Sequence, residues 1–337
     1  MDNLNTYGDI SPRTAAYAAV TLLNRGQYDL VIERFGQGKP IPRKHSKVIK
    51  FRRYESLPRA TAPLAEGVPP AGRKLSKTDV TATLEQYGDI VELTDVIYDT
   101  HEDDVLKEMM GLCGEQAAET VEVIRIAVLK AGTNVFYASS VASRALVNAA
   151  PTRSDLRRVY RYFRKHKAKT ISSIVKASAM ISTEPVAPAF FAMGHTDLDA
   201  DIRAMSGFIP VEQYSNSDKA LPAEIGKVDQ FRFILTPLFE PWDQAGVSGS
   251  TFLTGGTTGT GSADVYPLII VAQDSYGIVP LQGENAVTPM VVNPNKPSHS
   301  NPLGQSGFVS WKTYQTACIL NQNWVARLEC AATQSPS

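Results

Sequence analysis

Two segments of alternating residues between positions 47 and 94 constrain the fold of this chain more than any other feature. Residues 47–54 and 75–94 both show the period of two that is typical of β-strands, and a proline-rich stretch separates them. An isolated two-stranded ribbon is not stable in water, because it has no second layer against which to bury its apolar side chains. Since both faces of its first strand are mixed, we expect this ribbon to lie on another surface.

The charge of this region changes sign along the chain. Residues 39–53 carry seven Lys or Arg and no acid, whereas residues 85–122 carry twelve Asp or Glu and only Lys107 as a basic residue. The whole chain is neutral, with 34 basic and 34 acidic residues, and a dedicated nucleic-acid-binding protein usually has a basic excess. A neutral molecule with a basic projection and an acidic stretch is suited to bind copies of itself.

Length and composition favour a folded protein of one or two domains. The 337 residues are 43% hydrophobic, which suffices for a core and excludes global disorder. Cys113, Cys318 and Cys330 lack metal-ligand spacing, so we expect buried or free thiols in a reducing compartment. The chain starts without the features of a signal peptide, and it contains no run of about 18 apolar residues that would span a membrane. We therefore expect a soluble protein made in the cytoplasm.

A long helix is predicted from about Thr100 to Lys130. Acidic residues fill its first turn, where the helix dipole favours negative charge, and Asp103 stands where a capping box has its carboxylate. The helix would be about 42 Å long, which exceeds most globular helices. Its apolar positions recur at helical spacing and are Val105, Met109, Leu112, Cys113, Ala117, Thr120, Ile124 and Val128.

The rest of the chain alternates helices and strands, which predicts an α+β fold. A first helix is expected between Ser11 and Gly26, and a basic helix begins at Thr152 or Ser154. Gly88 indicates a bulge or bend in the second long strand, after which the strand is expected to become more buried. Further elements are expected as a helix over 197–205 and strands over 189–192, 230–237, 267–272, 308–320 and 324–331.

No motif for catalysis or cofactor binding is complete. Residues 255–261 are glycine-rich but lack the Gly-Lys-Ser/Thr ending of a phosphate loop, and the carboxylates of 197–201 lack the glycine and glutamate of a calcium loop. His101 has no second histidine at helical spacing, and Ser173 to Lys176 matches Ser-x-x-Lys without the companion motifs. We therefore expect no enzymatic activity, no catalytic residue, no cofactor and no metal site.

The basic helix after Thr152 leaves two interpretations open. Its cations either form a solvated face or contact phosphate or an acidic neighbour, and phosphate binding of this kind would be non-specific and sensitive to salt. The residues predicted to make such a contact with phosphate or an acidic neighbour are Arg157, Arg158, Arg161, Arg164 and Lys165.

Three stretches of the chain resemble the Hong Kong 97-type major capsid proteins of tailed bacteriophages, in particular a podophage-type (coliphage N-four-like) branch. They are Lys44-His-Ser-Lys-Val-Ile-Lys-Phe-Arg-Arg53, Gly88-Asp-Ile-Val-Glu-Leu-Thr-Asp95 and the ending from Asn301-Pro-Leu-Gly304 to Glu329. The order of elements is similar over nearly the whole chain. The resemblance implies a virion protein, assembled in the cytoplasm of a bacterial host, that forms an icosahedral shell of hexamers and pentamers around double-stranded DNA.

The resemblance also implies how the chain is divided. The implied regions are an N-terminal arm (1–46), an extended β-ribbon loop (47–99), a peripheral domain with the long spine helix (100–150), an axial domain (151–300) and C-terminal strands that return to the peripheral domain (301–337). The implied partners are other copies of the chain, packaged DNA, and scaffolding, portal and decoration proteins, with no membrane. The alternatives are an encapsulin-like compartment shell and a non-specific nucleic-acid-binding protein.

The reversal of charge suggests which residues meet where two subunits touch. We expect the basic strand of one copy to lie near the acidic helix of the next, and each exposed ion pair contributes under about 1 kcal/mol. Repetition over a closed shell would multiply this small energy. The residues predicted at this contact are Lys47, Lys50, Arg52 and Arg53 on one side and Glu108, Glu115 and Glu119 on the other.

Overall fold

The structure is a computed structural model, and it describes most of the chain beyond residue 30. The described residues are 31–42, 44, 46–61, 63, 72–100, 105–176, 182–214, 221, 223–248, 252–255, 261–280, 288–297 and 301–334. The helix expected after Ser11 and the cap expected at Asp103 lie outside these residues.

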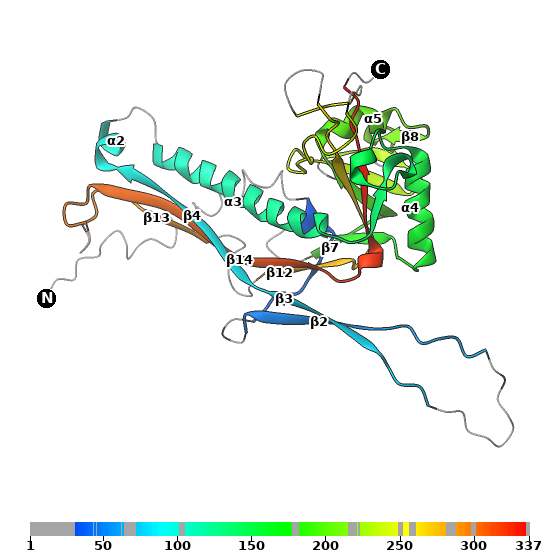
Figure 1. The fold of residues 1–337 in the computed structure, drawn as a ribbon. Helices are drawn as coiled ribbons and strands as arrows, with labels where there is room; N and C mark the ends of the chain where they lie inside the picture. Colours follow the sequence, from blue (N-terminus) through cyan, green and yellow to red (C-terminus); the bar gives the residue numbers. More distant parts are fainter. Residues whose placement is uncertain are drawn as a thin grey trace.

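Two β-sheets, a separate ribbon and one long helix set the shape of the molecule (Figure 1). The five-stranded sheet consists of β1 (Gln37–Gly38), β12 (Tyr276–Pro280), β14 (Ser306–Ile319), β13 (Thr288–Val292) and β4 (Glu85–Thr94). The eight-stranded sheet consists of β5 (Val135–Tyr137), β15 (Val325–Cys330), β11 (Tyr266–Val271), β7 (Ser182–Gly194), β10 (Phe231–Leu235), β9 (Glu224–Val228), β8 (Phe208–Pro210) and β6 (Ile171–Lys176). The ribbon consists of β2 (Val48–Tyr54) and β3 (Lys77–Thr83).

The α-helices in the described residues are α2 (Asp95–Thr100), α3 (Val105–Lys130), α4 (Arg153–Lys165) and α5 (Asp199–Arg203). Short 3₁₀ turns are η1 (Ile32–Arg34), η2 (Ala138–Ser140), η3 (Arg144–Leu146), η4 (Thr196–Leu198), η5 (Val211–Gln213) and η7 (Gln322–Trp324). Among the described residues, no helix combines the length and the apolar character that crossing a membrane requires. The structure confirms the mixture of helices and strands that the sequence predicts.

The long helix is confirmed, but its buried face is only half predicted. In the first half, Met109, Cys113 and Ala117 are buried against β4 and β14, as expected, but Leu112 of the expected stripe is 57% exposed, so its placement there was wrong. In the second half, the expected positions Ile124 and Val128 are wrong, because a glutamate and an arginine occupy the buried face and an apolar pattern does not register them. The buried residues there are Val121, Glu122, Arg125, Ile126 and Leu129.

The second long strand is two strands that belong to different sheets. β3 pairs with β2 in the ribbon, whereas β4 pairs with β14 over its whole length. The β4–β14 register is regular, so of the bulge or bend expected at Gly88 the bulge is wrong, and the bend stays a prediction. A Cβ atom on Gly88 would lie 2.5 Å from the carbonyl oxygen of Trp311, so glycine permits a close approach of two backbones instead. Leu93 is buried as expected, but Ile90 and Val91 are exposed.

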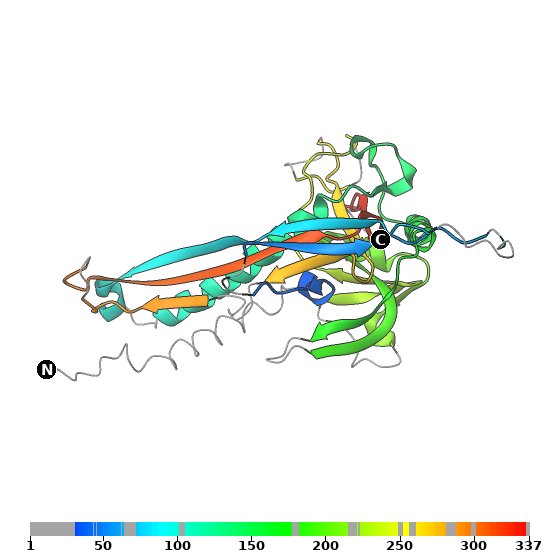
Figure 2. The ribbon, with the colours of Figure 1, turned by 90° about the horizontal axis from the view of Figure 1, so that it is seen from below.

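The two C-terminal strands lie in different sheets. β14 packs against α3 in the five-stranded sheet, as the resemblance implies. Figure 2 shows β14, in orange-red, running beside β4, in cyan. β15 pairs with β11 and β5 in the eight-stranded sheet, so this strand does not join the five-stranded sheet. The strands expected around 189–192, 230–237 and 267–272 are confirmed by β7, β10 and β11. The boundaries of the named domains stay predictions.

We predict that Gly88→Ala destabilises the subunit by about 1–3 kcal/mol, because the new methyl group meets backbone atoms that cannot move without separating β4 from β14. Unfolding by urea measures this change. Gly38→Ala is the matched control, since no atom lies within 4 Å of its added Cβ, and it should change the unfolding free energy by less than about 0.5 kcal/mol. Equal effects of the two substitutions would contradict the close-approach explanation.

Candidate subunit interface

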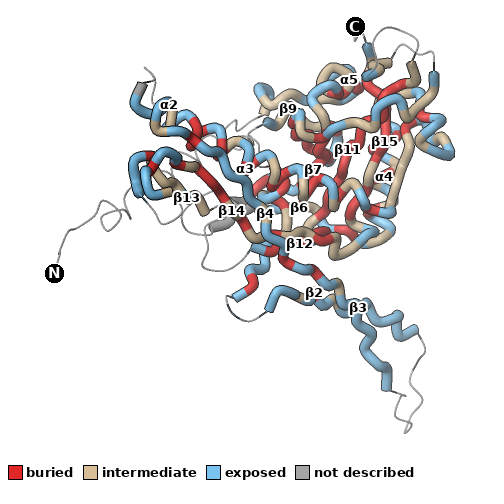
Figure 3. The backbone as a smooth tube through the Cα atoms, turned by 60° about the vertical axis from the view of Figure 1, so that its left-hand side comes forward, coloured by how far each residue is buried: buried red, intermediate tan, exposed pale blue. Residues whose placement is uncertain are grey.

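The ribbon projects away from both sheets and is buried only at its root (Figure 3). Its strands pair from Val48 opposite Thr83 to Tyr54 opposite Lys77. The root is held by Phe51, which is 7% exposed and packs in a small cluster with β12 and β14 residues. Farther out, the strands have solvent on both faces, so the packing that a stable β-ribbon requires is absent from the described part of a single subunit.

Two of the four predicted ribbon cations have partners inside the ribbon. Arg52 Nε lies 2.9 Å from Asp79 Oδ1 on the facing strand, and the hydrogen bond from Arg52 holds the pKa of Asp79 below its ordinary value. Arg53 Nη2 lies 2.9 Å from Glu55 Oε1. Lys47 and Lys50 form no ion pair with a described residue, so these two cations are the ones that remain available for another chain.

The predicted acidic residues lie along α3, on the opposite side of the five-stranded sheet from the ribbon (Figure 1). Glu108 and Glu119 are exposed and Glu115 is half-buried, and Glu108 and Glu115 also have interactions within their own subunit. The structure therefore does not bring the cations and the acids together in one copy. If they meet, they do so between copies.

Large exposed apolar side chains mark a surface that the sequence patterns do not predict. Most of them belong to the ribbon or to the far end of the five-stranded sheet, where α2 and β4 meet (Figure 1), and others lie on α3 and elsewhere. Exposed apolar side chains that follow one another, as on α2, are typical of protein–protein contacts. The residues are Val48, Tyr54, Leu57 and Leu75 on the ribbon, and Ile90, Val96, Ile97, Tyr98 and Leu303 at the far end of the sheet. The adjacent Val96, Ile97 and Tyr98 are three apolar residues in a row, a signal that an expectation of β-ribbon over residues 47–99 does not use.

The first half of the basic helix α4 uses its cations inside the subunit. Thr152 caps the helix through a reciprocal capping box with Asp155. Arg153 Nη2 lies 2.5 Å and Arg157 Nε lies 3.3 Å from the carboxylate of Asp229, in the turn that connects β9 to β10. The prediction that Arg157 faces a genome or a neighbour is thus weakened by an internal partner that lies far away in sequence.

Arg158 also contributes to its own subunit. Its guanidinium donates hydrogen bonds to the carbonyl oxygen of Tyr137 and to Ser140, and it lies 3.4 Å from Asp155. By contrast, Arg161, Arg164 and Lys165 are exposed and form no ion pair with a described residue. Of the five predicted residues, these three remain available for an anionic partner.

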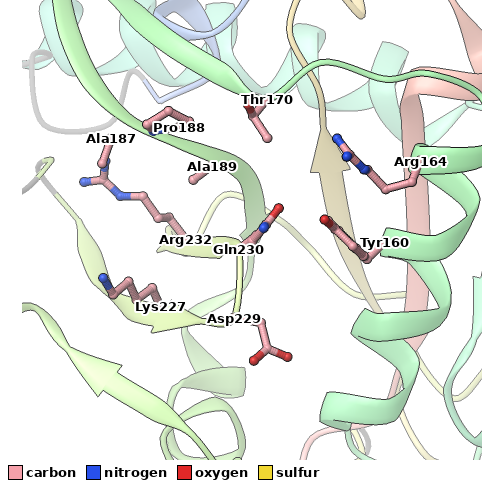
Figure 4. A pocket seen from close by; sticks show the side chains of 10 residues that line it. All are labelled: Tyr160, Arg164, Thr170, Ala187, Pro188, Ala189, Lys227, Asp229, Gln230 and Arg232. Carbon is pink, nitrogen blue, oxygen red and sulfur yellow. The ribbon is translucent and has the colours of Figure 1, made fainter.

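A shallow pocket of about 330 Å³ lies between α4, β7 and the β9–β10 turn (Figure 4). Arg164 lies on one side of this pocket, and Lys227 and Arg232 lie on the other side. Arg232 is already paired with the buried carboxylate of Glu224, so the cations do not converge on one ligand position. The described residues also contain no group of three or more His, Cys, Asp or Glu side chains placed to hold a metal ion.

Comparison with known proteins gives a consistent result. A family model described as "Phage capsid protein" matches residues 77–319. The major capsid protein of Pseudomonas phage KPP21 is 23% identical over 267 residues, which cover 74% of this chain and 66% of that protein. The chain thus spans about two thirds of the length of this relative. The capsid of Ralstonia phage GP4 is 10% identical, with a TM-score of 0.65 over 92% of each chain.

The fold is shared more widely than the sequence. The SrpI encapsulin of Synechococcus elongatus superimposes with a TM-score of 0.50 and 13% identity, over 100% of this chain and 94% of that one. At such identities the likeness shows the fold alone, which is the Hong Kong 97-type fold that the sequence predicts. The family match therefore carries more weight than the fold in choosing between a phage head and a compartment.

We predict that Phe51→Ala releases the root of the ribbon and destabilises its attachment by about 2–4 kcal/mol, because it removes the one aromatic ring buried there. Hydrogen exchange of the peptide over residues 48–54 measures the opening. Tyr54→Ala is the control, since Tyr54 is 61% exposed on the same strand and should change the opening free energy by less than about 0.5 kcal/mol. A similar opening in both variants would contradict a root held by Phe51.

Proposed function

The chain belongs to the phage capsid protein family, and we propose that it is the subunit that builds the head shell of a tailed phage by assembling with copies of itself around the viral DNA. The observation that carries this proposal is the family match over residues 77–319, which spans β3, α3 and most of both sheets. The protein's role is structural, and no chemical step is assigned to it.

The projecting ribbon supports assembly through contact between neighbouring copies. It has exposed side chains on both faces and lacks a second layer in its own subunit, so a neighbouring subunit supplies that layer. The exposed apolar residues on the ribbon and at the α2 end of the sheet add the apolar area that a stable interface needs. Hexamers and pentamers in an icosahedral shell follow from repetition of this contact.

Charge complementarity sets the register of this contact. Lys47 and Lys50, with Arg52 and Arg53 beside them, lie near Glu108, Glu115 and Glu119 of an adjacent copy. Each exposed pair adds little energy, but pairs of like charge at a wrong register cost more, so the charges select one arrangement. Because these pairs are exposed, salt weakens them.

The C-terminal half of α4 contacts an anionic partner in this proposal, and that partner is the phosphate backbone of the packaged DNA. Arg161, Arg164 and Lys165 supply three exposed cations that form no ion pair with a described residue of their subunit, although the Arg164 guanidinium lies over the ring of Tyr160. Such contacts bind any sequence, and they are compatible with a chain that is neutral overall. Scaffolding, portal and decoration proteins, the podophage branch and assembly in the host cytoplasm stay predictions from the resemblance.

An encapsulin-like compartment shell is the second candidate, because the SrpI encapsulin shares the fold. The two functions differ in what the shell encloses. Particles purified from infected cells should contain double-stranded DNA if the chain forms a phage head, whereas an enclosed protein without nucleic acid would favour the compartment.

We predict that the protein expressed alone, or with a scaffolding protein from the same source, forms closed shells, and that Lys47→Glu with Lys50→Glu abolishes them while the subunit stays folded. The reason is that the two introduced glutamates would then face acids of the neighbour and repel them. Negative-stain electron microscopy and sedimentation measure assembly, and circular dichroism confirms folding.

Two matched variants test the contact itself. Reversing Arg52 and Arg53, which have partners inside the ribbon, should reduce assembly less than reversing the two lysines. Changing Glu108, Glu115 and Glu119 to Lys in the lysine-reversed chain should restore shells. Normal shells from the lysine-reversed chain alone would exclude this contact, and a wild-type chain that stays monomeric even with scaffold would exclude the shell function.

We also predict that Gln at positions 161, 164 and 165 lowers the slope of log affinity against log salt for short double-stranded DNA by about 2–3, because each lost phosphate contact removes about one unit. Fluorescence anisotropy over a range of salt measures the slope. Gln at positions 153 and 157 is the control, since both arginines bind Asp229, and it should leave the slope nearly unchanged. Equal slopes for the wild-type chain and the first variant would contradict a DNA contact at this helix end.

A further inference from the structure

The first described segment, residues 31–35, is a turn buried at the junction of the two sheets. Figure 1 shows this short blue segment beside the end of α3 and near β7. Val31, Ile32 and Phe35 are all buried in the core that contains side chains of α3, β7, β11 and β12. The ring of Phe35 stacks on Phe191 of β7, with 4.2 Å between the ring centroids.

Two side chains from different elements hold the backbone of this turn. Glu122 of α3 is 0% exposed, and its Oε1 accepts hydrogen bonds from the amides of Val31 at 2.9 Å and Ile32 at 2.7 Å. The hydroxyl of Tyr276, on β12, donates to the carbonyl oxygen of Ile32 at 2.5 Å. The turn is thereby attached to the long helix by one carboxyl group and to the five-stranded sheet by one hydroxyl group.

The charges around Glu122 neutralise it only in part. Arg125 Nη1 lies 3.1 Å from Glu33 Oε2 but 4.0 Å from Glu122 Oε2, so the arginine is closer to the other acid. Arg34 contributes a further positive charge to this site, and burial lowers the pKa of that guanidinium. Within the described residues, Glu122 Oε2 and Arg125 Nε have no hydrogen-bond partner. An ionised carboxylate with one unpartnered oxygen in a core is costly.

Burial therefore raises the pKa of Glu122 to about 7, although the Ile32 amide, Arg125 and the Val31 amide act in the opposite direction. The closed turn holds a proton that an opened, hydrated Glu122 would release at a lower pH. By linkage, the state that binds more protons loses stability as pH rises between the two pKa values. The closed state is thus fully stabilised below pH 4.5 and loses this stability up to about pH 7.

We propose that residues 31–35 form a strap that closes over protonated Glu122 and opens as this carboxyl group ionises. The strap leads through β1 on the edge of β12 into the first ribbon strand, so its opening loosens the chain between the long helix and the ribbon. The device acts inside one subunit and goes beyond shell formation. An experiment that excludes the strap would leave the proposed shell function standing, and one that excludes the shell function would leave the strap standing.

Hydrogen exchange of the unassembled full-length chain tests this proposal. Between pH 5 and pH 8 the opening constant of the peptide over residues 31–36, corrected for the intrinsic exchange rate, should rise on the order of a hundredfold. In Glu122→Gln, which is neutral at every pH, the opening constant should not change with pH. Glu119→Gln removes an exposed acid about one turn away and should keep the wild-type pH dependence. A wild-type opening constant that does not change with pH would overturn the proposal.

Tyr276→Phe provides a second variant that leaves Glu122 in place. It removes the hydroxyl that holds Ile32, so the strap should open more at every pH with the same pH dependence. Loss of the pH dependence in this variant would assign the titration to another group and overturn the proposal. The peptide over residues 266–271 of β11 separates local from global opening, because it lies in the same core and should stay protected across this pH range.

Discussion

The buried contact between Glu122 and the turn at residues 31–35 ties the long helix to the chain at the point where the two sheets meet. The first half of α3 packs on β4 and β14, and its second half packs in the core shared with β7, β11 and β12. Without the turn, that second core would lose Ile32 and Phe35 at the point where both sheets meet the helix. A buried acid at this point costs desolvation energy, so the position is one where packing and protonation are coupled.

The ribbon shows the opposite situation, in which a single subunit lacks the packing that an element needs. Phe51 anchors the root, but beyond it the strands expose Val48 and Tyr54 to solvent. The chain belongs to a capsid family, and in the shell proposed above a neighbouring subunit would supply the missing layer. The same reasoning applies to α2, whose Val96 and Ile97 are exposed at the far end of the sheet.

The sequence predicts elements whose signal is local and misses contacts whose partners are distant. β2 and α3 follow from periods of two and 3.6, which are written in consecutive residues. Glu122 is a charged residue at a buried position, and its hydrogen-bond partners lie about 90 residues away in sequence. The apolar periodicity therefore misplaces the buried face in the second half of α3. The internal partner of Arg157 is hidden from the sequence pattern for the same reason, since Asp229 lies 72 residues away. At Gly88, the reason for a glycine is the backbone of β14, which no local pattern contains.

The ion pairs of this subunit separate into two kinds that have different consequences for assembly. Arg144 and Arg327 hold the buried carboxylate of Glu329 on β15 of the eight-stranded sheet, and salt screens such partly buried pairs much less than exposed ones. Lys47 and Lys50 are exposed, so their attraction to acids is screened at physiological salt and contributes less energy than the exposed apolar side chains. In the proposed assembly, apolar burial would therefore supply most of the binding energy between subunits, and the exposed charges would decide the register in which that surface is buried.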